Sequence, residues 1–130
     1  MNQYLWIAGV LCFLLGLVHS ILGEILIFRN KKKHNKIVPT IVTSKLKERQ
    51  LRIIWATWYL TPFFGGSIGV MLIKIGTKQA EMSAYLMQSI ITAITITMLS
   101  ASFLVFIATK GKHLGWVILL VIGILNLLAL

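Results

Sequence analysis

Acidic residues are almost absent from this chain of 130 residues, which has three Glu and no Asp. Its one cysteine, Cys12, excludes a disulfide-stapled scaffold. Charged residues make up 12% of the sequence, about half the share usual in soluble domains. The sequence has no P-loop, dinucleotide-binding, zinc-protease or Cys-x-x-Cys motif. The sequence therefore lacks the motifs that usually support phosphoryl transfer, zinc-dependent hydrolysis and redox-thiol chemistry.

Apolar side chains and positive charge are what the chain has in excess. Apolar residues reach 58% without counting glycine, and 13 Lys and Arg give a formal net charge of +10. High hydropathy excludes a disordered chain, and the small polar surface disfavours a soluble nucleic-acid binder. The composition therefore predicts an integral membrane protein without a nucleic-acid partner.

The apolar residues are grouped in runs long enough to cross a bilayer, for which a helix needs about 20 residues. Four runs qualify: 4–28, 53–73, 84–108 and 114–130. We expect the first to stay as a helix rather than to be cleaved, because no Lys or Arg precedes it and it is longer than a signal-peptide core. The sequence thus predicts an all-α, four-transmembrane-helix bundle, forming one integral membrane domain over 1–130.

The positive charges lie mainly in the first connection, 29–52, which holds nine of the 13 Lys and Arg. The third connection adds Lys110 and Lys112, and the second has only Lys74 and Lys78. Because cytoplasmic loops are enriched in Lys and Arg, connections 1 and 3 are predicted to be cytoplasmic. Both termini are then outside, most simply across a bacterial cytoplasmic (inner) membrane.

Small residues recur at helical spacing in every predicted span, and such residues let membrane helices approach closely. Proline in the second span, Pro62, is expected to kink that helix or to free a backbone carbonyl. The pattern favours a compact bundle, with or without further subunits. The small residues are Gly9, Cys12, Gly16, Ser20 and Gly23; Gly65, Gly66 and Gly69; Ser89, Ala93, Thr97 and Ala101; and Gly111 and Gly115.

Ionisable residues at membrane depth are functional candidates, and the first span has two, His19 and Glu24. Glu24 lies about 6 Å and His19 about 13 Å from the predicted cytoplasmic end. Arg52 is the first expected partner of Glu24, and Lys112 or His113 is the substitute. These five residues form a predicted polar cluster. The alternative is that Glu24 only extends to the interface and neutralises part of the basic loop.

His19 has three possible roles: a proton relay, a haem ligand, or a hydrogen bond to a hydroxyl of Ser89, Thr92 or Thr95. Haem ligation by two histidines needs a second ligand at the same depth, whereas His113 lies near the membrane surface. We therefore expect no cofactor and no metal site, with haem at His19 as the exception to test.

Aromatic residues gather in the same half of the membrane: Trp55, Trp58, Tyr59 and Trp116. Trp55 and Trp116 fit the aromatic belt at the headgroup level. Trp58 and Tyr59 lie a turn deeper. With His19 and Glu24 they are predicted to line a pocket that opens to a lipid headgroup or an amphiphile.

The basic connection is expected to contact anionic lipid headgroups at the cytoplasmic face. An acidic partner protein is the alternative, and the stretch from Ser44 to Glu48 offers a helix cap before the second span. The lysines expected at the headgroups are Lys31, Lys32, Lys33 and Lys36.

Three stretches taken together resemble a group of small four-helix bacterial membrane proteins of unknown function. They are Gly16-Leu-Val-His-Ser-Ile-Leu-Gly-Glu24, Arg52-Ile-Ile-Trp55 with Trp58-Tyr59, and Lys110-Gly-Lys-His-Leu-Gly-Trp116. The resemblance implies no activity. It implies that His19, Glu24, Arg52, His113 and Trp116 form one cytoplasmic-side cluster. In that group a Trp-His pair is expected where this chain has Trp58-Tyr59.

Small multidrug-resistance transporters also have four spans and a glutamate in the first helix. Their connections are short, their charge bias is weak and their carboxylate lies near mid-membrane, unlike Glu24. The sequence favours a non-enzymatic accessory or structural subunit of a membrane complex, or a homo-oligomer. The alternatives are a small transporter or proton-coupled channel using His19 and Glu24, and a lipid- or cofactor-binding membrane enzyme.

Overall fold

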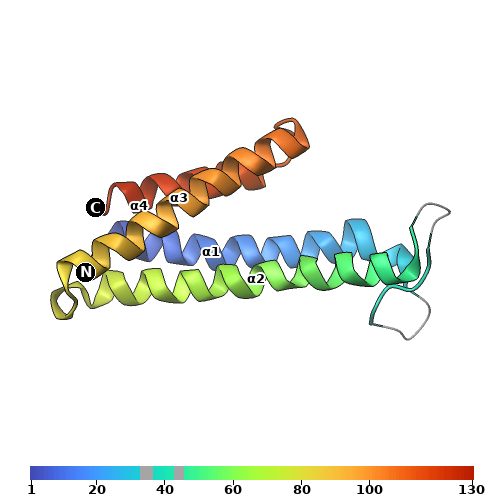
Figure 1. Ribbon diagram of the computed structural model, residues 1–130, viewed down its shortest axis with the longest axis horizontal. Helices are drawn as coiled ribbons and strands as arrows, with labels where there is room; N and C mark the ends of the chain where they lie inside the picture. The colour runs from blue at the N-terminus through green and yellow to red at the C-terminus, as the bar shows by residue number, and fades with distance from the viewer. Residues whose placement is uncertain (33–36, 43–45) are drawn as a thin grey trace.

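The computed structural model describes residues 1–32, 37–42 and 46–130, and in these residues the protein is all-α (Figure 1). The longest elements are three helices, and a shorter fourth helix follows them. Along the chain the elements are α1 (Gln3–Leu22), a π-helical segment η1 (Gly23–Phe28), the 3₁₀ turn η2 (Arg29–Lys31), α2 (Glu48–Thr77), the 3₁₀ turn η3 (Gln79–Glu81), α3 (Ala84–Thr109) and α4 (Gly115–Leu127).

Three stretches are long and apolar enough to cross a membrane: Gln3–Lys31, Glu48–Thr77 and Ala84–Thr109. The fourth predicted span is shorter than expected, because α4 has 13 residues and a length of about 20 Å. A hydrocarbon core is about 30 Å thick. The described residues therefore hold three helices of spanning length and one shorter apolar helix.

Helix α2 begins within the segment predicted as a loop. Its N-terminus is capped by Gln50, whose side-chain oxygen accepts the Lys47 backbone N–H over 2.9 Å. The helix runs through Pro62 without interruption and ends beyond the predicted boundary, where the Thr77 hydroxyl donates to the carbonyls of Ile73 and Lys74. Arg49 and Arg52 consequently lie on the first turns of a helix and not in a loop.

The four helices form two antiparallel hairpins. Helix α1 packs along α2 and α3 packs along α4, while α1 meets α4 over a smaller area and α2 barely touches α3. The hairpins are together at the end that holds both termini and diverge toward the turn between α3 and α4 (Figure 1). The compact bundle expected from the sequence is thus closed at one end only, where all four helices share a buried core.

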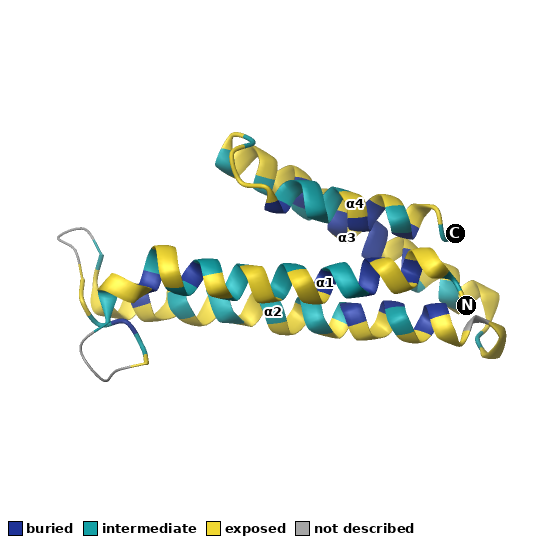
Figure 2. Cartoon of the chain, turned by 180° about the vertical axis from the view of Figure 1, so that it is seen from behind, coloured by how far each residue is buried: buried dark blue, intermediate teal, exposed yellow. Residues whose placement is uncertain are grey.

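All four helices contribute to this core. Its buried members are Leu5, Ala8 and Cys12 of α1, Leu72 and Ile75 of α2, Ile91, Ile94 and Met98 of α3, and Ile122 of α4. Figure 2 shows buried positions gathered on the helices near the termini, and Phe28 and Leu51 are buried at the other end of the α1–α2 hairpin; most of the remaining helix surface is exposed. The exposed surface is rich in large apolar side chains, as expected of helices that face lipid.

Small residues bring α1 and α2 into close contact. A Cβ added to Gly9 would lie 2.7 Å from the carbonyl oxygen of Gly69, and one added to Gly69 would lie 2.8 Å from that of Gly9. Further along, Gly16 packs against Pro62. The small-residue face predicted for the first helix is therefore the face that packs on α2 within the same chain.

The turn between α3 and α4 is fixed by backbone geometry. Lys110 and Gly111 have positive φ values of 51° and 74°, and Gly111 N–H donates to the Phe106 carbonyl over 2.9 Å. Such a left-handed C-terminus ends a helix and reverses the chain. Helix α4 then returns along α3, with Gly123 against the Leu99 side chain.

Candidate functional site

The candidate site lies where α1 gives way to η1 beside the first turns of α2. In η1 each backbone hydrogen bond spans one residue more than in an α-helix, as in the bond from Arg29 N–H to the Glu24 carbonyl. A single π turn inside a helix changes which side chains face a neighbour and often marks a functional site. It is followed here by the 3₁₀ turn η2, which carries the chain back toward α2.

Trp58 of α2 binds the end of α1 in two ways. Its indole stacks on the imidazole of His19, with ring centroids 4.2 Å apart and an angle of 13° between the planes. Its Nε1–H donates to the His19 carbonyl over 3.1 Å. Gly23 makes room for the ring, because a Cβ at this position would overlap the indole nitrogen. Trp58 is thus packed against α1 by its ring face and by its N–H.

Glu24 is held by groups from two directions. The Tyr59 hydroxyl of α2 donates to Oε2 over 2.8 Å, and Lys32 Nζ donates to Oε1 and forms an ion pair. The Lys32 side chain is 17% exposed and that of Glu24 is 38% exposed, so the ammonium group is largely covered by protein while the carboxylate stays partly open to solvent. The Glu24 carboxylate therefore connects Lys32, directly after η2, with Tyr59 of α2.

Phe28 packs in the interior of the site, against the aromatic rings of α2. It is fully buried and lies edge-on to Trp58, with centroids 6.1 Å apart, while the Tyr59 ring is 6.3 Å away. Trp55 lies one turn before Tyr59 in α2, with the two ring centroids 5.0 Å apart. We call this group the aromatic–carboxylate cluster; its members are His19, Glu24, Phe28, Lys32, Trp55, Trp58 and Tyr59.

Two nitrogen atoms in this cluster are buried without a hydrogen-bond partner among the described residues: His19 Nε2 and Trp55 Nε1. Buried polar atoms are paired in the great majority of cases, because leaving one unpaired costs free energy. These two atoms are the groups in the cluster that remain available to a water molecule or a ligand.

The structure divides the predicted polar cluster. Arg52 lies next to Glu48, with 3.9 Å between Nη1 and Oε1, and not next to Glu24. Within the described ranges, neither a hydrogen bond nor an ion pair joins Lys112 or His113 to Glu24. Lys32 takes the place expected for Arg52, since it follows η2 and reaches back to the carboxylate.

The residues predicted at the start of the fourth helix stabilise their own turn. His113 is exposed, and its Nδ1 accepts the Gly115 backbone N–H over 3.0 Å. Trp116 donates from Nε1 to the Gly111 carbonyl over 3.2 Å and lies edge-on to Phe106. These contacts all lie within the α3–α4 hairpin.

The lysines expected at lipid headgroups have different surroundings. Lys31 accepts the backbone N–H groups of Thr40 and Ile41 at its carbonyl, each over 2.9 Å, and Lys32 is bound to Glu24. Lys33 and Lys36 fall outside the described residues, as does Ser44 of the predicted helix cap.

Two of the three hydroxyl partners expected for His19, Ser89 and Thr95, bond within α3. Ser89 donates to the Tyr85 carbonyl and Thr95 donates to the Ile91 carbonyl. Among the described residues, no group of three or more His, Cys, Asp or Glu side chains could hold a metal ion. The cluster instead offers a carboxylate held by a phenol and an ammonium group, beside a stacked imidazole.

Phe28 and Lys32 are the cluster members that sequence reasoning did not assign to this site. Phe28 is four residues after Glu24, which is a spacing that faces the same side of a helix. Lys32 is eight residues after Glu24, and no regular helix spacing of that pair predicts the contact made through η1 and η2. Comparison of the chain with protein-family models, with curated proteins and with solved structures found no match.

Proposed function

We propose that this chain is a small non-enzymatic integral membrane protein that acts as an accessory or structural subunit, either beside other membrane helices or as a homo-oligomer. One observation carries the proposal: at most 28% of the most apolar stretch of each long helix is buried within the chain. The two hairpins diverge, so much of the surface of α3 is left to lipid or to another helix.

The outer face of α3 is suited to a close helical neighbour. Ser89, Ala93 and Thr97 are exposed there, four residues apart. The hydroxyls of Ser89 and Thr97 donate to carbonyls of their own helix, each over 2.9 Å, so no hydroxyl proton on this stripe is left unbonded. Small residues with satisfied polar groups let two helices approach closely within a bilayer.

The proposed placement has four crossings, with both termini outside and the basic connection inside a bacterial inner membrane. The excess of Lys and Arg in connections 1 and 3 supports it. Figure 1 also shows both termini at the end of the molecule opposite the basic connection. Helix α4 crosses in this proposal despite its length of about 20 Å, since the bilayer thins around short helices.

Disulfide cross-linking tests the association. In a Cys12→Ala background, Ala93→Cys is expected to give cross-linked dimers or a mixed disulfide with a partner subunit. The matched control is Val70→Cys, an exposed position of α2 at a similar distance from its helix end. A particle that is strictly monomeric in mild detergent, with no co-purifying partner and no cross-link at Ala93→Cys, would contradict the proposal.

A small transporter or proton-coupled channel is the second candidate, favoured by the buried, unpaired Nε2 of His19 within the described residues. A titratable nitrogen at membrane depth is suited to proton transfer. Flux in proteoliposomes should then fall in His19→Gln and in Glu24→Gln. Flux that neither variant changes would remove this candidate.

A further inference from the structure

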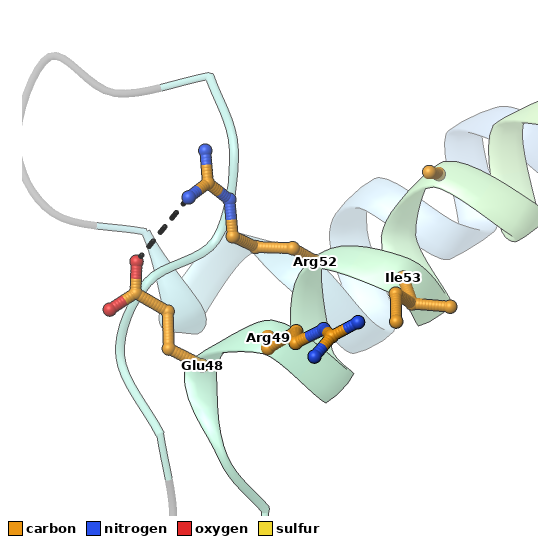
Figure 3. Close-up of a pocket in the computed structure, with 5 residues that line it drawn as sticks. Glu48, Arg49, Arg52 and Ile53 are labelled. Carbon is orange, nitrogen blue, oxygen red and sulfur yellow. Dashed lines mark ion pairs between the residues drawn. The ribbon is translucent and has the colours of Figure 1, made fainter.

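A shallow, open groove of about 620 Å³ runs along the first turns of α2, at the end of the hairpin that adjoins the basic connection (Figure 3). Two guanidinium groups, a carboxylate and two apolar side chains of this one helix line it. The lining residues are Glu48, Arg49, Arg52, Ile53 and Ala56. It lies outside the aromatic–carboxylate cluster and shares none of its residues.

The lining residues are ordered along the helix from charged to apolar. Arg49, Arg52, Ile53 and Ala56 have the spacing i, i+3, i+4 and i+7, which places them on one stripe of α2. The stripe extends for about 10 Å along the helix axis. Its charged end adjoins the basic connection, and its apolar end continues into the stretch of α2 that is apolar enough to cross a membrane.

The charge of the groove is positive. Glu48 approaches Arg52 at 3.9 Å, but their side chains are 52% and 58% exposed, and an ion pair this long and this exposed contributes little. In the part of the chain that the structure describes, Arg49 makes no ion pair. Figure 3 shows the two guanidinium groups pointing to different sides, Arg52 toward Glu48 and Arg49 toward Ile53. Because both side chains are exposed and the Glu48–Arg52 pair is weak, they can turn toward one anion without breaking a strong contact.

We propose that this groove binds an anionic phospholipid, with the headgroup phosphate between Arg49 and Arg52 and the first part of an acyl chain along Ile53 and Ala56. Guanidinium groups match phosphate through paired hydrogen bonds, and the order of charged and apolar residues is that of a phospholipid entering the bilayer. The site is distinct from the loop lysines, of which Lys32 is bound to Glu24. The inference rests on the proposed membrane placement.

Native mass spectrometry of the full chain in a neutral detergent measures the binding, with dioleoylphosphatidylglycerol as probe and dioleoylphosphatidylcholine as reference. We expect the anionic lipid to be retained preferentially. The double variant Arg49→Gln/Arg52→Gln should lower its association constant about tenfold. The double variant Lys110→Gln/Lys112→Gln, which removes the same charge from the α3–α4 turn, should change it less than about twofold. Equal losses in the two double variants would overturn the proposal.

A gain of binding provides the complementary test. Glu48→Gln removes the one negative charge of the groove and should raise the association constant about threefold to fivefold. Ala56→Phe should fill the apolar end and weaken binding of the long-chain lipid while retaining both arginines. If Glu48→Gln weakens binding, or if Ala56→Phe leaves it unchanged, the lipid does not lie along this stripe.

Two further measurements are needed. The first distinguishes a lipid headgroup from free phosphate, and the second tests the membrane placement independently of lipid binding. Inorganic phosphate at the concentration of the lipid should not displace it; displacement by phosphate would show a free-anion site and overturn the lipid assignment. Extraction of membranes with alkaline carbonate tests the placement itself. A chain released by carbonate refutes the proposed function, whereas a retained chain without lipid selectivity refutes only this inference.

Discussion

The indole of Trp58 lies flat on the imidazole of His19, a residue 39 positions earlier in the chain. The same indole donates a hydrogen bond to the His19 backbone carbonyl. Stacking and hydrogen bonding by one side chain fix the register of α1 against α2 at the end that adjoins the basic connection. The absence of a side chain at Gly23 is the condition for both contacts.

Gly23→Ala is predicted to destabilise this junction. Its Cβ would overlap the Trp58 indole, so the ring must move and both contacts to His19 are lost. We expect the free energy of unfolding to fall by about 1–3 kcal/mol. Unfolding by sodium dodecyl sulfate in a mild detergent, followed by circular dichroism, measures the change.

Gly65→Ala is the control for that substitution. Gly65 lies in α2, and an added Cβ would have the Cys12 carbonyl oxygen at 3.9 Å as its nearest neighbour, an ordinary contact. Because alanine is favoured over glycine within a helix, stability should rise by about 0.5–1 kcal/mol or stay unchanged. Equal losses at the two positions would show that Trp58 is not constrained by Gly23.

The Glu24–Lys32 pair is predicted to contribute more than an exposed pair. Glu24→Gln leaves the largely covered ammonium group of Lys32 without its partner and should cost about 1–3 kcal/mol. Lys32→Met leaves a carboxylate that is 38% exposed and still accepts from Tyr59, so it should cost less, about 0.5–1 kcal/mol. The double variant should cost less than the sum, since the pair is lost once. A double-mutant cycle on the free energy of unfolding gives the coupling.

An exposed pair supplies the comparison. Lys78 and Glu81 are 2.9 Å apart with side chains 64% and 66% exposed, so Glu81→Gln should change stability by less than about 0.5 kcal/mol. Strict additivity of the two variants at Glu24 and Lys32 would contradict the ion pair described here.

Asn126 is predicted to lower the stability of the chain. Its side chain is fully buried in α4, and neither its oxygen nor its nitrogen has a hydrogen-bond partner among the described residues. Asn126→Leu, which is close in size, should raise the free energy of unfolding by about 1–3 kcal/mol. The same detergent unfolding experiment measures it.

The control is Thr95→Val on the neighbouring helix α3. Thr95 is also buried, but its hydroxyl donates to the Ile91 carbonyl over 2.8 Å, so its loss should be neutral or cost up to about 1 kcal/mol. A loss of stability in Asn126→Leu would show that the amide makes a polar contact, for example with a water molecule or another chain.

The sequence predicted several parts of the fold because they depend on local patterns. Apolar runs of spanning length predicted the three long helices, and the spacing of Gly9, Gly16 and Gly23 predicted a face for helix packing. The same reasoning grouped His19 and Glu24 with Trp58 and Tyr59, which the structure brings into direct contact.

The divergence of the hairpins and the partner of Glu24 could not be predicted in this way. Hydropathy tells which residues avoid water but does not tell how far α3 lies from α2, because lipid and protein are equally apolar neighbours. The contact of Lys32 with Glu24 depends on the lengthened turn in η1, and a regular helical wheel contains no such turn.

In the proposed placement the chain crosses the membrane with the basic connection and the α3–α4 turn inside and both termini outside. Labelling of single cysteines in spheroplasts by a membrane-impermeant maleimide tests it, in a Cys12→Ala background. Lys78→Cys and Leu130→Cys should react before lysis, whereas Lys47→Cys and Lys112→Cys should react only after it. Reaction of Lys47→Cys or Lys112→Cys in intact spheroplasts, or protection of Leu130→Cys, would contradict the four-crossing account.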